Sequence, residues 1–200
     1  MNKNEALRDF VEKYVKGQWQ HEFIAIDEEY RKNKESIDKG LKLAFESLCK
    51  KAIALQEIKA KGKIKYIYFS FLRTSIMENT AFYRLDAYDE KWFLDKQECS
   101  VMWDADFIFR NLFNHIEEIQ TKTVAYARKI TPIDIEEIKF CEALKYNTLT
   151  IEFLKEMVPV LIECEAYKEM VKDTDITILA GEFMDISEVL YESVQDGKVE

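Results

Sequence analysis

The sequence IKYIYFSFLRTSIMENTAFYRLDAYDEKWFLD, residues 64–95, decides the fold class, because nothing else in the chain departs so clearly from helical spacing. Its first part, from Ile64 to Leu72, is nearly all apolar or aromatic, which is typical of a strand covered on both faces. Residues 82–88 alternate instead and place Arg84 and Asp86 on one face. We therefore expect a small antiparallel sheet in the middle of the chain, with residues 175–180 as a further candidate strand.

The rest of the chain is patterned as helices. Apolar residues recur at steps of three or four in residues 1–60 and again in residues 104–194. In the later part we expect a helix after Asp104, a helix from Thr131 and Pro132, and a last helix over residues 186–194. The expected fold class is α+β. It consists of one mainly helical globular domain, residues 1–200, with N-terminal helices, the aromatic-rich strands at 64–95 and a helical C-terminal half.

The longest apolar stripe runs from Phe23 to Ile58. Its spacing fits one long helix or two helices joined near Asn33, and the sequence does not decide between them. A core-packing helix and a dimerisation surface both explain such a stripe. We expect Phe23–Ile58 to bind a protein partner or a second copy of the chain.

The composition is that of an ordinary globular protein, with 34% charged residues, two prolines and no linker-like run. No stretch approaches the roughly 18 uninterrupted apolar residues of a membrane span, and the N-terminus lacks the apolar segment of a secretory signal. The four cysteines have no metal-type spacing, so we expect reduced thiols, with Cys99 as the candidate for reactivity. These features predict a cytoplasmic protein that does not enter a membrane.

The net charge of −9 is distributed unevenly. Residues 1–100 carry 19 basic and 17 acidic groups, whereas residues 101–200 carry 10 and 21. We expect the two regions to face one another, within the chain or across a dimer. Nucleic-acid binding is not expected, because the overall negative charge repels a phosphate backbone.

The second strand of the aromatic region supplies the best candidate ligand site. Arg84, Asp86 and Tyr88 follow one another at alternate positions. An arginine and a carboxylate about 7 Å apart between aromatic walls can hold a small polar molecule. The same pattern also describes a solvent-facing strand with one ion pair. The candidate ligand-binding residues are Arg73, Arg84, Asp86, Tyr88 and Trp92.

Other chemistry has weaker support in the sequence. His115 and Glu118 lie one helical turn apart and could ligate a metal ion, but a surface pair is the better explanation of them. The chain has no glycine-rich phosphate loop and no nucleophile signature. We therefore predict no cofactor and no metal, and leave open whether a reaction is catalysed.

These observations lead to two hypotheses about function. The first is a non-catalytic cytoplasmic protein-interaction or regulatory protein, acidic and able to form a homodimer. The second is a small-molecule-binding protein or enzyme that uses the aromatic and charged face of residues 73–95.

Overall fold

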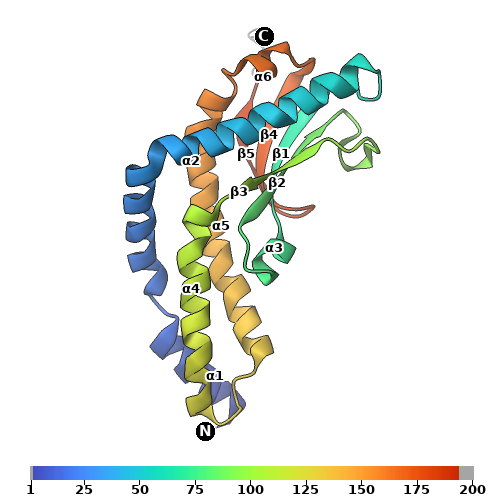
Figure 1. Cartoon of the computed structure of the whole chain (residues 1–200). Helices are drawn as coiled ribbons and strands as arrows, with labels where there is room; N and C mark the ends of the chain where they lie inside the picture. Colours follow the sequence, from blue (N-terminus) through green and yellow to red (C-terminus); the bar gives the residue numbers. More distant parts are fainter. Residues whose placement is uncertain (1, 194–200) are drawn as a thin grey trace, which may run out of the picture. The chain divides into compact units, whose positions relative to one another are not determined.

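The computed structural model describes residues 2–193 and contains helices and strands in mixed order (Figure 1). The α-helices are α1 (Lys3–Tyr14), α2 (Gln18–Glu57), α3 (Arg73–Met77), α4 (Asp106–Lys122), α5 (Pro132–Leu161) and α6 (Glu165–Glu169). The strands are β1 (Ile64–Phe71), β2 (Phe82–Tyr88), β3 (Ser100–Asp104), β4 (Lys172–Glu182) and β5 (Ser187–Glu192). Two short 3-10 helices are η1 (Trp92–Leu94) and η2 (Thr123–Tyr126). The predicted α+β class is confirmed.

The chain forms two compact units, and each is assembled from segments that are separate in sequence. Within the described residues, the helical unit contains residues 2–34, 73–81 and 105–149, and the sheet unit contains residues 35–72, 82–104 and 150–193. Two helices, α2 and α5, contribute one part to each unit. Helix α2 bends at Asn33, where φ is −115° and ψ is 17°, and this bend lies next to the boundary between the units. The single globular domain expected from the sequence stays a prediction.

The sheet has five strands in the order β3-β2-β1-β4-β5. Neighbouring strands are antiparallel except for the central pair, β1 and β4, which run parallel. The prediction of a small antiparallel sheet is therefore wrong in two respects, because the sheet is mixed and larger than expected. Strand β4 includes the candidate strand at 175–180.

The last helix expected from the sequence is also wrong within the described residues. Residues 187–192 form the edge strand β5, which pairs with β4, and position 194 lies outside the described residues. Gly181 makes the hairpin between these strands possible, since a Cβ atom there would lie 2.2 Å from the carbonyl oxygen of Ile186. The helical C-terminal half predicted for 104–194 therefore ends before β4.

One face of the sheet packs against helices of the same unit. Phe45 of α2 stacks on Phe69 of β1, with ring centroids 6.3 Å apart. Phe153 in the later part of α5 stacks on Trp103 of β3 at 6.0 Å. Because side chains alternate along a strand, the opposite face carries the intervening residues of β1 and β2. The sheet unit thus leaves a second, separate face for other contacts.

Part of the apolar stripe of α2 is buried inside the chain. Leu41, Phe45, Leu48 and Ala52 are fully buried. In the helical unit, Phe23 packs edge-on against Tyr146 of α5, with ring centroids 5.3 Å apart. The buried part of the stripe therefore serves as core, as in a helix that packs on its own domain.

Segment 73–81 is fixed in the helical unit by a buried lysine. The Lys139 ammonium of α5 donates to Asn79 Oδ1 at 3.0 Å and to the Met77 carbonyl at 3.3 Å. Only 1% of Lys139 is exposed, so these acceptors and Glu136, 3.0 Å away, replace its water.

No helix in residues 2–193 combines the length and apolarity needed to cross a membrane.

The start of α5 is stabilised by reciprocal hydrogen bonds, as the Thr131-Pro132 sequence predicts. Asp134 Oδ2 accepts from the Thr131 backbone N–H at 2.7 Å and from its hydroxyl at 2.6 Å. Lys3 of α1 lies 2.9 Å from Asp134 Oδ1. The two Thr131 bonds and the Lys3 ammonium lower the pKa of Asp134 to about 2.

We predict that Asp134→Asn lowers the free energy of unfolding by about 1 kcal/mol at neutral pH, because the ionised capping group is lost. The folded-state pKa is below the unfolded value of about 3.9, so this stabilisation is present above pH 4 and disappears as the pH falls toward 2. Urea unfolding of both proteins across this pH range measures the difference. Glu137→Gln, an exposed change in the same helix, is the control; an equal loss there would contradict the capping role.

Candidate functional site

The candidate site is the face of the sheet opposite the packed helices. It is called the aromatic face here and consists of Tyr66, Tyr68 and Ser70 of β1 with Arg84, Asp86 and Tyr88 of β2. The antiparallel register pairs Tyr66 with Tyr88, Tyr68 with Asp86, and Ser70 with Arg84. The alternation of residues 82–88 that was read from the sequence thus produces one continuous surface across two central strands.

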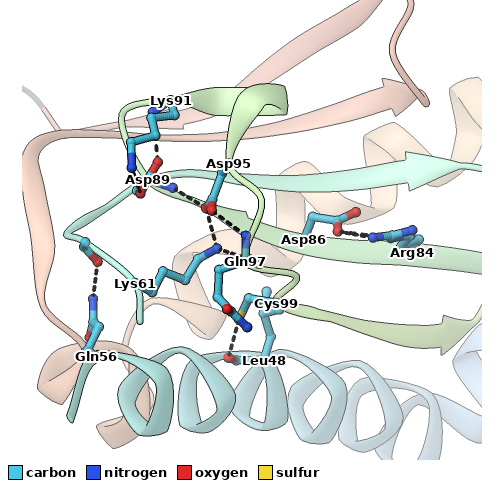
Figure 2. Close-up of polar contacts among 11 residues, drawn as sticks. Leu48, Gln56, Lys61, Arg84, Asp86, Asp89, Lys91, Asp95, Gln97 and Cys99 are labelled. Atoms are coloured by element: carbon cyan, nitrogen blue, oxygen red, sulfur yellow. Dashed lines mark hydrogen bonds and ion pairs between the residues drawn. The ribbon is translucent and has the colours of Figure 1, made fainter. Parts of the chain in front are cut away.

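Arg84 and Asp86 form the polar centre of this face (Figure 2). The Arg84 Nε donates to Asp86 Oδ1 at 3.0 Å, and Nη2 lies 2.9 Å from the same oxygen. Arg84 also reaches Glu98 Oε1 at 3.3 Å. Asp86 is only 1% exposed, and its burial raises the pKa of the carboxyl group although Arg84 opposes the shift.

Two buried polar atoms on this face, Asp86 Oδ2 and Ser70 Oγ, make no hydrogen bond of acceptable geometry among the described residues, although the Tyr88 side chain interacts with the Asp86 carboxyl group. Ser70 is fully buried and lies directly opposite Arg84, so it is a diagonal neighbour of Asp86 on the same face. Leaving a buried polar group unsatisfied costs about 1–3 kcal/mol, and more for a charged one. Buried polar atoms of this kind are satisfied in a folded protein by a water molecule, an ion or a bound ligand.

An aromatic cluster covers the face. Trp92 of η1 lies with its ring centroid 4.1 Å from Tyr66 and 5.6 Å from Tyr88. Phe93 packs on Tyr88 at 5.4 Å and on Phe183, from the β4–β5 connection, at 6.1 Å. The Arg84 guanidinium in turn lies 5.7 Å from the Phe183 ring. Aromatic rings thus surround the Arg84–Asp86 pair.

Trp92 and Phe93, which cover the face, belong to residues 89–97. This segment is called the capping segment below. Trp92 has a left-handed backbone with φ of 56°, which is uncommon for a bulky residue. Such conformations persist only where the surrounding structure imposes them, and they concentrate at ligand clamps and switch regions. The left-handed backbone of Trp92 therefore indicates that contacts elsewhere hold the capping segment in place.

A buried ion pair fixes the base of the capping segment. Figure 2 shows Lys61, from the connection between α2 and β1, reaching Asp95. The Lys61 ammonium lies 2.5 Å from Asp95 Oδ2 and donates to the Gln97 carbonyl at 2.8 Å. Asp95 also accepts backbone N–H bonds from Asp89 at 3.3 Å and Gln97 at 3.0 Å. The side chain of Lys61 is 0% exposed and that of Asp95 4%.

The surroundings of Asp95 favour its ionised carboxylate. Burial raises the pKa of Asp95, but the Lys61 ammonium and the two backbone N–H groups outweigh it, so the pKa is below its ordinary value. Next to the pair is a pocket of about 470 Å³. Its lining includes Lys59, Lys61, Lys63, Asp89 and Asp173, so charges of both signs meet there.

The structure brings four of the five predicted ligand-binding residues into one unit. Arg84, Asp86, Tyr88 and Trp92 lie together on or over the aromatic face. Arg73 opens α3 and belongs to the helical unit. Sequence reasoning missed Ser70, Lys61, Phe93 and Phe183. A polar residue inside the apolar run of β1 was the available signal for Ser70, whereas Lys61 resembled the lysines around it.

The weak metal candidates lie on α4 in the helical unit. His115 hydrogen-bonds the backbone of Tyr14, and burial lowers its pKa. Glu118 lies 3.5 Å from Lys122. Within residues 2–193, no group of three or more His, Cys, Asp or Glu side chains is placed to hold a metal ion.

A comparison of the chain with protein-family models found no match, and comparisons with curated proteins and with solved structures found no significant match.

We predict that Lys61→Met lowers the free energy of unfolding by about 3–5 kcal/mol, because Asp95 is left charged and buried without its partner. Chemical denaturation at neutral pH measures the change. The control is Lys91→Met, since Lys91 is 64% exposed and 3.8 Å from Asp89, for which we expect a loss under about 1 kcal/mol. Similar losses in both variants would show that the Lys61–Asp95 pair does not anchor the capping segment.

Proposed function

We propose that this protein is a binding protein for a small molecule with a flat ring and an edge of N–H donors, taken up on the aromatic face of its sheet. The observation that carries the proposal is the buried Asp86 carboxylate, whose Oδ2 makes no hydrogen bond of acceptable geometry among the described residues, although the Tyr88 side chain interacts with this carboxyl group. A carboxylate oxygen is an acceptor only, so its missing partner is a donor.

The arrangement of the face supports this ligand class. Arg84 occupies Oδ1 of Asp86 and leaves Oδ2 for the ligand. Ser70 Oγ, the diagonal neighbour, can donate to an acceptor or accept from a second donor. Tyr88, Trp92 and Phe93 supply apolar ring surface beside these groups. Ligand sites commonly combine such walls with a few converging polar groups.

Access to Asp86 requires the covering rings to move, because both unpartnered atoms are buried. The base of the capping segment is held by Lys61 and Asp95, whereas Trp92 and Phe93 lie at its tip. Rotation of these two side chains is a smaller rearrangement than displacement of the whole segment. Side chains that are exposed or partly exposed change rotamer faster than a loop opens.

Protein interaction through Phe23–Ile58 was the other hypothesis. It has less support, because the buried part of the stripe packs on Phe69 and Tyr167 in the sheet unit and on Tyr146 in the helical unit. The large exposed apolar residues of this segment, Ile24, Leu43 and Ile58, are spread along the helix and beyond its end. Scattered exposed apolar residues are normal on protein surfaces.

The binding proposal is tested with benzamidine, a flat ring that carries an N–H donor edge, and with native mass spectrometry of gently purified protein. Wild type is expected to bind the probe or to retain a small molecule. Asp86→Asn should weaken binding by about 10- to 100-fold, because the acceptor Oδ2 is replaced by a donor.

The matched control is Glu98→Gln, which changes the exposed partner of Arg84 and should alter the affinity less than about twofold. Equal effects of the two substitutions would contradict a role for Asp86 Oδ2. If neither the probe nor a retained molecule is found on folded wild-type protein, the binding proposal is wrong.

Binding should also depend on pH through Asp86. The ligand's N–H donates to the ionised carboxylate, so protonation of Asp86 removes the acceptor. Because burial raises the pKa of Asp86, affinity should begin to fall at a higher pH than for an ordinary aspartate, whose pKa is about 3.9. Calorimetric titration at several pH values checks this, and a flat profile down to pH 4 would contradict it.

A further inference from the structure

Cys99 does not provide a reactive site in the sheet unit. It is 2% exposed, its thiol donates to the Leu48 carbonyl at 3.9 Å, and burial raises its pKa to about 11. The expectation that Cys99 is the reactive cysteine therefore has no support from its surroundings. The pocket beside Lys61 differs from it, because several of the charged residues that line the pocket are exposed to solvent.

This pocket lies between three segments of the sheet unit. It has a volume of about 470 Å³ and is lined by Gln56, by residues 59–63, by residues 89–91 at the start of the capping segment, and by Asp173 of β4. The Gln56 amide donates to the Gly62 carbonyl at 2.9 Å and to the Val171 carbonyl at 2.8 Å (Figure 2). Gln56 therefore joins the 59–63 loop to the residues that precede β4 on one side of the pocket.

Lys59 has a left-handed backbone at the point where α2 ends, with φ of 57°. Its N–H donates to the Gln56 carbonyl at 2.9 Å, and the N–H of Ala60 donates to the Leu55 carbonyl at 2.9 Å. This is the Schellman arrangement, in which glycine is the usual left-handed residue. The turn itself gains nothing from a lysine side chain, so glycine can replace Lys59 without disturbing the backbone.

The lysines around the pocket have unused hydrogen-bond donors. Lys61 donates to Asp95 and to the Gln97 carbonyl, which uses two of the three N–H donors of its ammonium group. The ammonium groups of Lys59 and Lys63 make no hydrogen bond or ion pair with residues 2–193, although the carboxylate of Asp173 attracts Lys63. Positive charge with free donors therefore lines one wall.

Asp89 provides a negative charge in the same pocket, and its side chain is only 9% exposed. Its Oδ1 accepts from the Lys91 backbone N–H at 2.9 Å. Its Oδ2 is 3.8 Å from the Lys91 ammonium, which is too long for a hydrogen bond. The same oxygen would lie 3.5 Å from a Cβ atom at Gly62. An acceptor with spare capacity thus lies beside the glycine that separates Lys61 from Lys63.

The charges of the pocket nearly balance. Its lining contains four lysines and three acidic residues, namely Lys59, Lys61, Lys63, Lys91, Asp89, Glu90 and Asp173. A ligand that is only an anion is repelled by the carboxylates, and a ligand that is only a cation is repelled by the lysines. A molecule that carries one charge of each sign can pair with both. The volume is in the range of pockets that hold small molecules.

We propose that this pocket binds a free α-amino acid with a polar side chain. The ammonium group of the amino acid donates to Asp89 Oδ2, and its carboxylate accepts from Lys59 and Lys63. A polar side chain is expected because every lining residue except Ala60 and Gly62 carries a charged or amide group. The proposal is independent of ligand binding on the aromatic face.

The experiment is a titration of isotope-labelled full-length protein with each polar L-amino acid in turn, followed by the amide resonances in solution NMR. We expect at least one to bind with a Kd below about 1 mM and to shift the Gly62 amide. Its α-amide lacks the carboxylate and its N-acetyl derivative lacks the ammonium group. Each should bind at least about 10-fold more weakly than the amino acid.

Three outcomes of these titrations overturn the proposal. The first is that no polar amino acid binds folded protein at about 10 mM. The second is that the α-amide or the N-acetyl derivative binds as tightly as the amino acid, because the pocket is then a site for a single charge. The third is that the shifts are confined to the aromatic face, around Tyr66 and Tyr88.

Two substitutions test the charges separately. Lys59→Gly keeps the left-handed turn and removes the ammonium group, so affinity should fall about 5- to 10-fold without a fall in melting temperature. Asp89→Asn keeps Oδ1 as acceptor for the Lys91 N–H, and affinity should fall about 10-fold.

The matched control is Lys96→Gln, which removes a positive charge from an exposed residue of the same unit that does not line the pocket. Its affinity for the amino acid should change less than about twofold. Equal losses in Lys59→Gly and Lys96→Gln would show a general effect of net charge and overturn the role of Lys59. Circular dichroism of each variant shows whether it is folded.

Discussion

A lysine side chain that is fully buried needs acceptors inside the protein to replace its water, and Lys61 has them in Asp95 and the Gln97 carbonyl. Asp95 in turn accepts from two backbone N–H groups, so one ion pair determines where the capping segment begins and ends. The left-handed Trp92 lies between these fixed points. The cover of the aromatic face therefore depends on a charge pair located outside that face.

The two strands that carry the site were predictable, because the aromatic run of β1 and the alternation of β2 are strong local signals. The strand β5 was not predictable from the sequence. Ile186, Val189 and Leu190 recur at helical steps, and only pairing with β4 makes this segment extended. The parallel pairing of β1 with β4 joins residues about a hundred positions apart, for which no local pattern exists.

The residues of the candidate site also fall into two groups. Some are predictable from the local sequence pattern, and others depend on contacts with distant parts of the chain. The shared face of Arg84, Asp86 and Tyr88 follows from the period of a strand, and the structure places them so. Ser70 comes to this face through the register with β2, and Phe183 through a hairpin late in the chain. Whether Lys61 is buried depends on Asp95, more than thirty residues away. Partners at such distances are settled by packing rather than by neighbouring residues.

The parallel pairing of β1 and β4 has a consequence for how the protein is made. During synthesis β1 and β2 emerge from the ribosome early, but β4 follows only after about a hundred further residues, or roughly 5–20 seconds at ordinary elongation rates. Until then the nascent chain presents one unpaired edge of a strand that contains Ile64, Ile67 and Phe69. An apolar edge exposed for that long is a template for pairing with other chains. The yield of this protein in cells should therefore depend on chaperones that bind nascent polypeptides.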